Sequence, residues 1–205
     1  MPHLDLRSAL SVPALFRLFK RAIGADNVMA TFVRDHARPK AGHRVLDIGC
    51  GLGDVLEYFP DEPVDYLGLD ASAAYVASAR ERYGARARFA EGRVGEITLD
   101  EPGSFDLVLA VGVLHHLDDG EARRLLELGR GALKPGGRLA SLDGCYTGDQ
   151  SRLARLIVSR DRGAHVRSEA DYLELAGGCF GRVESHILHD MLRIPYTHII
   201  LECEA

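Results

Sequence analysis

Cysteine is scarce in this sequence, and its few residues do not cluster. The four are Cys50, Cys145, Cys179 and Cys203, and no two of them form a Cys-x-x-Cys pair. Zinc sites and the disulfide frameworks of small domains need closer spacing than this. The spacing therefore excludes a domain held together by zinc or disulfides, and we expect free thiols.

Long apolar runs are also absent. Around the most apolar part of the chain, residues 107–114 are the longest stretch without charged residues or histidine. A membrane-spanning helix requires roughly 20 apolar residues. We therefore expect no segment that spans a bilayer and no membrane partner.

The chain has fewer basic residues than acidic ones. Lysine and arginine number 25 against 30 aspartates and glutamates, which gives a formal net charge of −5. This balance supplies no field to hold phosphate backbones, so no nucleic-acid partner is expected. Near the N-terminus, Asp5 precedes a short apolar segment and Arg17 follows it. That charge order is the reverse of a secretory signal and favours a cytoplasmic protein.

The remaining composition fits a single domain over residues 1–205. The chain is 46% hydrophobic and 27% charged. A chain of this length buries about 70% of its unfolded surface and needs no disulfide or metal for stability. The pattern divides it into three parts: a helical cap over residues 1–40, a core over residues 41–145, and further helices with a terminal β-hairpin over residues 146–205.

The cap is expected to hold two helices between residues 8 and 37. Ser11 is the expected N-cap of the first helix, and Gly24 ends it. The second helix starts at Asp26, and Pro39 lies just beyond its end. Its apolar positions are Val28, Met29, Phe32 and Val33.

From residue 44 onward, short apolar runs alternate with helices, which is typical of a parallel sheet covered on both faces. The expected strands are residues 44–48, 66–69, 87–90, 106–111, 138–142, 182–188 and 196–203. The expected helices lie near residues 54–59, 72–83, 118–133 and 150–158, with one more that Ser168 opens. Residues 134–137, Lys-Pro-Gly-Gly, are expected to end the third of these helices.

Because only residues 190–195 join the last two strands, a helical crossover has no room, and these strands pair antiparallel. The predicted fold class is therefore α/β, in a three-layer Rossmann-like arrangement. It has a seven-stranded, mostly parallel sheet with an antiparallel final strand and an N-terminal helical cap.

A glycine-rich loop follows the first expected strand. Gly49, Gly51 and Gly53 stand between that strand and a helix, where glycines let the backbone approach a ligand closely. An NAD-binding loop requires glycine or alanine where Asp54 stands. Negative charge at a helix start also disfavours a pyrophosphate. These residues therefore argue against a dinucleotide.

Two acidic residues indicate a different ligand. Asp70, at the end of the second expected strand and 19 residues past Gly51, can accept both hydroxyls of a ribose. Asp47 adds a second carboxylate at the entrance of the loop. Carboxylates suit an ammonium or sulfonium better than a phosphate. A nucleoside with a cationic tail fits this pattern.

At this point the chain resembles the class I S-adenosylmethionine-dependent methyltransferases of the small-molecule type. Four segments in the same order carry the resemblance: VLDIGCGLG at 45–53, YLGLDAS at 66–72, FDLVLAVGVLHHL at 105–117 and LKPGGRL at 133–139. The resemblance covers roughly residues 40–145. It implies that S-adenosylmethionine is the cofactor, that S-adenosylhomocysteine is its product, and that residues 41–145 bind them.

The resemblance also implies a role for individual residues. The loop with Gly49, Cys50 and Gly51 faces the methionine part of the cofactor, next to Asp47. Asp70 and the adjacent Ala71 hold the ribose, and Ala110 lies near the methionyl amine. Arg93 and Val94 flank the adenine. Arg93 is a departure, because the family often has an acid there and an arginine can only donate; backbone groups, Glu91, Glu96 or stacking by Arg93 are the alternatives.

Candidate groups for the transfer step lie after the fourth and fifth expected strands. His115, His116, Asp143, Tyr146 and His165 are candidate proton acceptors or walls of the transfer site. Packed histidines and a solvated charged loop are the simpler interpretations.

Other side chains are weaker candidates for the same site. Arg162 and Arg167 are expected to hold an acidic substrate if the 160–167 segment reaches it. Cys145 is a weak candidate nucleophile. No metal site is expected, because neighbouring histidines rarely ligate one ion, and His186 and His189 are treated as surface residues.

The predicted function is methyl transfer from S-adenosylmethionine to a small molecule. A non-catalytic binding protein on the same fold is the alternative, and a nucleotide-dependent reductase is a second one. The cap helices are expected to lie over the ligand crevice as a lid. The sequence identifies neither the acceptor atom nor the oligomeric state.

Overall fold

The computed structural model describes residues 22–61, 63–94, 96, 99, 101–160, 163–189 and 191–205. The first expected cap helix, which Ser11 would open, lies outside the described residues, and so does Arg162. Within the described part of the chain, no helix is long and apolar enough to cross a membrane.

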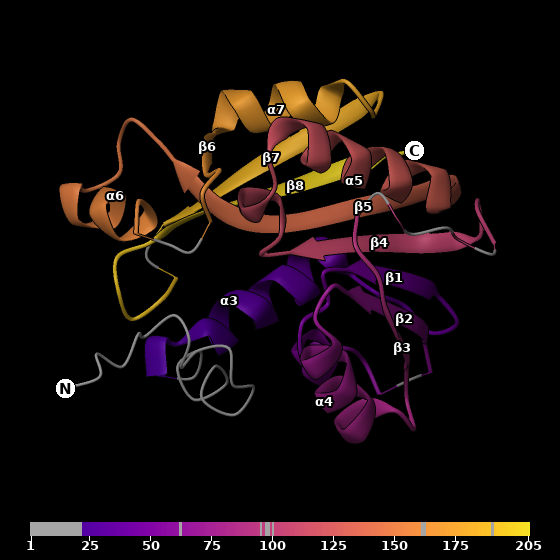
Figure 1. Ribbon diagram of the computed structural model, residues 1–205. Helices are drawn as coiled ribbons and strands as arrows, with labels where there is room; N and C mark the ends of the chain where they lie inside the picture. Colours follow the sequence, from indigo (N-terminus) through magenta and orange to yellow (C-terminus); the bar gives the residue numbers. More distant parts are fainter. Residues whose placement is uncertain are drawn as a thin grey trace.

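One mixed sheet runs through the molecule (Figure 1). In the described residues, seven strands form a continuous path in the order β3-β2-β1-β4-β5-β8-β7. They are β1 Arg44–Ile48, β2 Asp65–Asp70, β3 Arg88–Glu91, β4 Phe105–Val111, β5 Leu133–Tyr146, β7 Arg182–His189 and β8 Thr197–Glu204. A two-residue strand that the sequence did not predict, β6 (Arg167–Ser168), pairs with β5 off this path.

The strand directions follow the prediction. All pairs from β3 to β5 are parallel, whereas β8 is antiparallel to both β5 and β7. The short connection between β7 and β8 makes them a hairpin, with Ile187 opposite Ile199. The predicted α/β fold with a mostly parallel sheet and an antiparallel final strand is confirmed.

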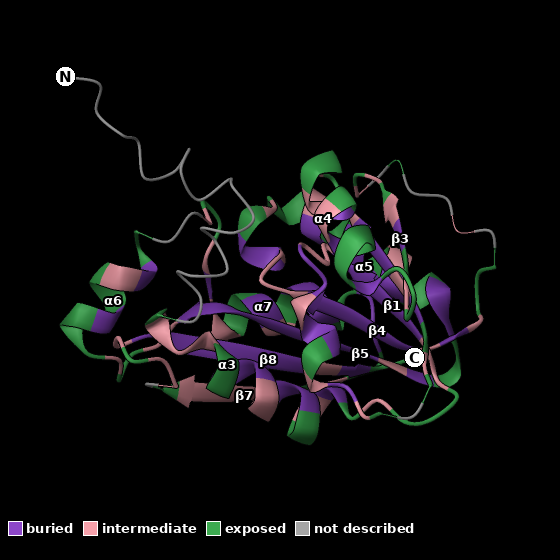
Figure 2. Cartoon of the chain, turned by 90° about the horizontal axis from the view of Figure 1, so that it is seen from below, coloured by how far each residue is buried: buried purple, intermediate pink, exposed green. Residues whose placement is uncertain are grey.

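Helices cover both faces of the sheet, which gives the expected three layers. Helices α5 (Asp119–Ala132) and α7 (Glu169–Gly177) lie on one face, and α3 (Ala25–Thr31) and α4 (Ala73–Tyr83) lie on the other (Figure 1). Two separate clusters of buried apolar residues correspond to these faces. In Figure 2 the strands are mostly buried, whereas the outer helix faces are exposed.

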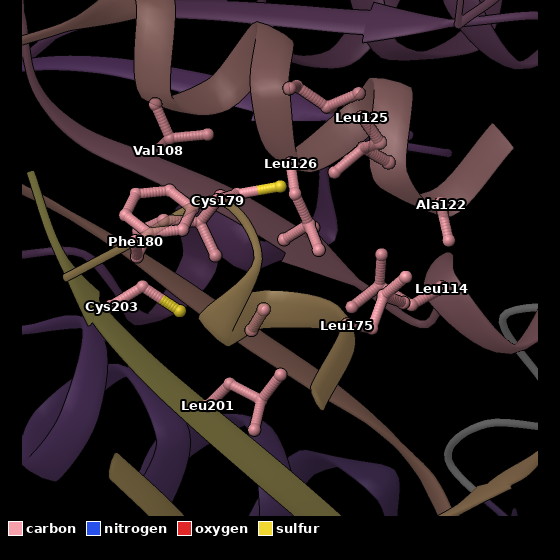
Figure 3. Packing of buried hydrophobic residues seen from close by; sticks show 14 of the residues in the cluster. Val108, Leu114, Ala122, Leu125, Leu126, Leu175, Cys179, Phe180, Leu201 and Cys203 are labelled. Atoms are coloured by element: carbon pink, nitrogen blue, oxygen red, sulfur yellow. The ribbon is translucent and has the colours of Figure 1, made fainter. Parts of the chain in front are cut away.

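Helix α5 shows why the sequence folds this way. Asp118 accepts a hydrogen bond from the Glu121 amide at 2.8 Å, and this capping box starts the helix where the sequence predicts it. The apolar face of the helix then buries Leu125 and Leu126 against Leu175 of α7 and the sheet (Figure 3). Each fully buried leucine contributes roughly 1.5–3 kcal/mol.

Strand β5 is much longer than the expected strand at 138–142. Residues 134–137, expected to end the preceding helix, do follow the last residue of α5, Ala132. They lie in the first part of β5, where the pairing with β4 shifts register between Phe105 and Leu107. Gly136 absorbs the irregularity with a φ of 77°. Residues 138–142 of β5 then pair with β4 on one side and β8 on the other. At its other end the strand runs on to Tyr146, so Asp143 lies within it.

The second cap helix is confirmed in place but not in form. The α-helix α3 ends at Thr31, and a π-helical segment, η1 (Phe32–Ala37), continues it. All four expected apolar positions are buried. Gly24, expected to end the preceding helix, is the N-cap of α3 with a φ of 80°. The described part of the cap therefore packs against the sheet along its predicted face.

Candidate active site

A cleft of about 680 Å³ opens at the carboxyl ends of β1, β2 and β4. In an open parallel sheet these ends are where ligands bind. Of the nine residues predicted to contact the cofactor, eight line this cleft: Asp47, Gly49, Cys50, Gly51, Asp70, Ala71, Arg93 and Val94. The fold therefore brings together residues that are up to 47 positions apart in the sequence.

The loop after β1 turns sharply. The amides of Gly49 and Cys50 both donate hydrogen bonds to the Leu69 carbonyl, at 2.7 and 3.0 Å. Gly49 and Gly51 have positive φ values of 78° and 56°. A Cβ atom at Gly49 would clash with Val113, whereas one at Gly51 would meet no protein atom within 4 Å. Gly51 thus presents bare backbone to the open space of the cleft, as a close ligand contact requires.

Asp70 ties this loop to the next helix. Its two carboxylate oxygens accept hydrogen bonds from the Gly51 and Ser72 amides, each at 2.8 Å. A carboxylate has about four lone-pair positions, so each oxygen keeps capacity for a further donor such as a hydroxyl. The same side chain can therefore fix the shape of the loop and accept hydrogen bonds from a ligand in the cleft.

Asp47 is buried beneath the loop. The Tyr66 hydroxyl donates a hydrogen bond of 2.6 Å to it. Burial first, and the Asp47 charge second, raise the pKa of Tyr66 well above its usual value, so the phenol stays a donor. Burial, with Asp47 and Asp70, also raises the pKa of the Cys50 thiol. Cys50 is therefore a neutral wall of the cleft.

The charge of the cleft is negative. Asp47, Asp54, Asp70, Glu96 and Glu121 line it, and Arg93 is the single lysine or arginine among the lining residues that the structure describes. Arg93 is exposed at the end where β3 leaves the sheet. A cationic ligand is therefore favoured over a phosphate.

Ala110 is the one predicted cofactor residue that the structure places elsewhere. It is fully buried in the core and does not line the cleft. The next two residues, Val111 and Gly112, line it instead. Successive strand residues face opposite sides of the sheet, so the Ala110 side chain enters the core while its neighbour lines the cleft. The position of Ala110 near the methionyl amine stays a prediction.

His115 and Asp143 form a buried pair at one end of the cleft. His115 lies in a short 3-10 helix, η3 (Leu114–His116), and its Nδ1 is 2.7 Å from Asp143 Oδ1. The His115 amide donates to the same oxygen at 3.2 Å. Because Asp143 projects from β5 and η3 follows β4, two neighbouring strands of the sheet fix the position of the imidazole.

Of the other candidate proton acceptors, His116 lies beside this pair, whereas Tyr146 and His165 do not line the cleft. His116 is exposed and lines the cleft, with its ring centroid 4.2 Å from that of His115. Tyr146 lines neither the cleft nor the neighbouring cavity described below; the Arg155 guanidinium lies 5.0 Å from its ring centroid. His165 is exposed, and its backbone amide donates to the His115 carbonyl at 3.0 Å.

Arg167 does not face a substrate, contrary to the expectation that it holds an acidic one. Its side chain is buried and donates to the Leu114 and Leu117 carbonyls, each at 2.8 Å, and to Asp119 at 2.7 Å. The sequence prediction missed this because isolated arginines in polar segments are usually exposed. Arg167 instead clamps the η3 turn that carries His115.

The described residues give little support for a cysteine nucleophile or for a metal site. All four cysteines are free, and burial raises the pKa of Cys145 to about 12, so it is not a nucleophile at neutral pH. Among the described residues, His36, His186 and Glu202 could together hold a metal ion. However, Arg38 already pairs with the Glu202 carboxylate, and Arg138 lies 3.8 Å from it. His189 lies near Asp149 on the surface.

A second cavity of about 440 Å³ adjoins the cleft, and we call it the apolar cavity. Met29, Val111, Gly112 and His115 line both spaces. Most of its other walls are aliphatic and come from four separate parts of the chain, including Val28, Leu142, Ile157, Leu192 and Ile194. Asp143, Arg160, Tyr196 and His198 add polar groups.

A family of known proteins matches most of the predicted cofactor-binding core. Residues 46–139 match a family described as a methyltransferase domain. Residues 46–139 are therefore a methyltransferase domain. The resemblance seen in the sequence is thereby confirmed.

Individual relatives match different lengths of the chain. A phosphoethanolamine N-methyltransferase of Triticum aestivum is 34% identical over 146 residues, 67% of this chain and 28% of the relative. A ubiquinone biosynthesis O-methyltransferase of Acinetobacter baylyi is 28% identical over 112 residues, 53% of this chain and 46% of the relative. The chain thus spans about half or less of the length of these relatives.

Solved structures show the same fold. Phosphoethanolamine N-methyltransferase 2 of Haemonchus contortus, in complex with S-adenosylmethionine, superposes with a TM-score of 0.69 at 21% identity. The match covers 88% of this chain and 52% of that chain.

Sequence reasoning missed the apolar cavity almost entirely. Leu192, Ile194 and Tyr196 lie in the connection between β7 and β8, which had no expected function. Leu156 and Ile157 belong to α6 (Arg152–Val158), which was expected only as a helix. The parallel-sheet rule gave one usable signal, because it placed Asp143 on the ligand side of the sheet.

Gly163 gives a first test of how tightly the His115 turn is packed. A Cβ atom there would clash with the His115 ring and carbonyl, so we expect Gly163→Ala to destabilise the protein by about 1–3 kcal/mol. Gly148→Ala is the matched control, since a Cβ there would meet no atom within 4 Å. Denaturant unfolding measures both, and equal stability of the two variants would contradict the packing.

Proposed function

We propose that this chain binds S-adenosylmethionine in the cleft and transfers its methyl group to a small molecule. The observation that carries the proposal is the cleft itself: an acid-rich space at the carboxyl ends of the strands, where Gly51 presents bare backbone beside the Asp70 carboxylate. A cationic nucleoside fits these groups, and a dinucleotide does not, because Asp54 opens the following turn, η2 (Asp54–Tyr58).

In this proposal Asp70 accepts hydrogen bonds from the ribose hydroxyls, and Ala71 lies beside it. The loop of Gly49, Cys50 and Gly51, above Asp47, receives the methionine part. Arg93 and Val94 line the adenine end. The sulfonium of S-adenosylmethionine supplies an activated methyl group, and the chain's own work is to align an acceptor with that methyl at about 3 Å and to exclude water.

A small-molecule acceptor is supported by the adjoining cavity of about 440 Å³ and by the net charge of −5, which disfavours nucleic acid. The curated relatives in ubiquinone and phosphoethanolamine metabolism are named for small-molecule chemistry. We also infer a cytoplasmic location, which the four free thiols support, because reducing compartments keep thiols free.

Asp70→Ala tests the binding part of the proposal. We expect its affinity for S-adenosylmethionine to fall roughly 10- to 150-fold, about 1.5–3 kcal/mol, because charge-assisted hydrogen bonds to the ribose are lost. Asp65→Ala is the control: Asp65 is on the same strand, but it pairs with Arg44 and Arg88 away from the cleft. Isothermal titration with S-adenosylmethionine, S-adenosylhomocysteine and NAD measures the affinities.

Unchanged affinity of a folded Asp70→Ala protein would refute the ribose assignment. Tighter binding of NAD than of S-adenosylmethionine would favour a reductase. Cofactor binding without turnover on any acceptor would leave the non-catalytic binding protein as the function.

A further inference from the structure

The apolar cavity has the form of a site for a largely apolar acceptor. Its walls are mostly aliphatic, and its polar side chains are few: His115, Asp143, Arg160, Tyr196 and His198. Small-molecule sites typically combine an apolar wall with a few placed polar groups. A charged or strongly polar acceptor would lose its hydration against Leu142, Leu192 and Ile194 without compensation.

The apolar cavity and the cleft meet at His115. This residue lines both spaces, together with Met29, Val111 and Gly112. A molecule in the apolar cavity can therefore extend one atom toward the contents of the cleft past the imidazole. His115 is the single histidine among the described residues that borders both spaces.

Asp143 sets the protonation pattern of that imidazole. It holds His115 Nδ1 at 2.7 Å, and a carboxylate in this position keeps the proton on Nδ1. Nε2, on the other side of the ring, is then the basic nitrogen. The carboxylate also stabilises the imidazolium that forms when Nε2 takes a proton, as an aspartate does behind a catalytic histidine in hydrolases.

Asp143 also limits what can enter the apolar cavity. The residue is 2% exposed, and within the described residues its Oδ2 atom has no hydrogen-bond partner. A buried carboxylate with spare acceptor capacity repels a carboxylate or phosphate acceptor. It also holds an amine in its protonated form, which lacks the lone pair needed for attack. A neutral hydroxyl meets neither obstacle.

We propose that the acceptor is an apolar molecule with a weakly acidic hydroxyl, of the phenol class, and that His115 is its general base. The hydroxyl proton passes to His115 Nε2 while the oxygen forms a bond to the sulfonium methyl carbon. The carbon–sulfur bond breaks with its electron pair left on sulfur. The products are a methyl ether, S-adenosylhomocysteine and an imidazolium that returns its proton to solvent. Asp143 is a positioning residue in this step.

Binding of matched probes tests the acceptor class. The inference rests on the proposed function, so the protein is first saturated with S-adenosylhomocysteine, and failure at that stage counts against the proposed function alone. Isothermal titration then compares 4-hexylphenol, 4-hexylbenzylamine and 4-hexylbenzoic acid, which share the alkyl chain and the ring. We expect the phenol to bind best, and affinity to rise up to about fourfold per methylene along a 4-alkylphenol series until the cavity is full.

Stronger binding of the amine or the acid would overturn the acceptor class, and so would absent binding of every alkylphenol to the saturated protein. An alkylphenol that binds in the cavity but is not methylated would overturn it as well. A 4-alkylphenol that is methylated supplies the substrate for the second test.

Replacement of His115 tests its role as base. We expect His115→Gln to lower turnover of a 4-alkylphenol by roughly 10²- to 10⁴-fold while affinity for S-adenosylhomocysteine stays within about threefold. The loss of turnover should become smaller as ring fluorination makes the hydroxyl more acidic, because a more acidic hydroxyl depends less on a general base. The limb of the pH–rate profile that reports the imidazole should disappear, and Asp143→Asn should shift that limb.

His189→Gln is the control, because His189 lies on the surface at the end of β7. An equal loss across the whole acidity series, or an unchanged pH profile, would give His115 a purely structural role. If His115→Gln lost cofactor affinity as well, the role of His115 would be judged from Asp143→Asn alone. An unaltered pH–rate profile in Asp143→Asn would contradict the proposal that Asp143 positions His115 as the base.

Discussion

Replacement of Gly51 by valine is expected to lower affinity for S-adenosylmethionine by at least about 100-fold. The Gly51 Cα directs a new side chain into the open space of the cleft, where a Cβ meets no protein atom within 4 Å. Valine would fill that space with two methyl groups and prevent close approach of the ligand to the backbone. A 100-fold change corresponds to about 2.7 kcal/mol of binding free energy.

The backbone strain of this substitution needs its own control. Gly51 has a φ of 56°, where a side chain costs roughly 1–2 kcal/mol. Gly42 has a φ of 76° and also lacks neighbours within 4 Å, but it lies in an exposed turn outside the cleft. Gly42→Val should therefore lose similar stability and keep full affinity, as measured by denaturant unfolding and isothermal titration.

If both valine variants bound S-adenosylmethionine equally well, the loop would not contact the cofactor. If Gly51→Val failed to fold, Gly51→Ala against Gly42→Ala would make the same comparison with less strain. Within either pair of variants, the difference in affinity for S-adenosylmethionine measures the effect of the ligand contact, because both variants carry a similar cost of backbone strain.

The cleft could be predicted from sequence because its parts are short and contiguous. A strand, a glycine turn and a terminal carboxylate are each encoded within a few residues, and the parallel sheet then brings Gly51 and Asp70 together at one edge. Ala110 marks the limit of this reasoning. The strand was predicted correctly, but which side of it faces the ligand depends on a single position.

The apolar cavity could not be predicted in this way. Its walls combine α3, the end of β5, α6 and the β7–β8 connection, which are more than 160 residues apart at their extremes. In the sequence, aliphatic residues in such segments look like ordinary core positions. Periodicity predicts that a side chain is buried, but it does not predict which other residues, or which ligand, the side chain contacts. The pairing of His115 with Asp143 likewise depends on the parallel register of β4 and β5.

Arg167 is the clearest case of a charged residue whose role only the fold reveals, and it gives the largest expected effect on stability. Its guanidinium donates to three backbone carbonyls, those of Leu114, Leu117 and His165, and to the Asp119 carboxylate. With apolar methionine in its place, Arg167→Met leaves those carbonyls without their donors in a partly dry environment.

We expect Arg167→Met to lower the free energy of unfolding by about 2–4 kcal/mol. Arg182→Met is the matched control, because Arg182 pairs with Glu184 and Glu204 on the exposed sheet edge, where such pairs contribute about 0–1 kcal/mol. Denaturant unfolding measures both variants. Because Arg167 holds the η3 turn, hydrogen exchange at the His115 amide should also quicken in Arg167→Met and not in Arg182→Met. A loss of stability in Arg167→Met no larger than in Arg182→Met would show that the carbonyls find other partners and that the turn holds without its clamp.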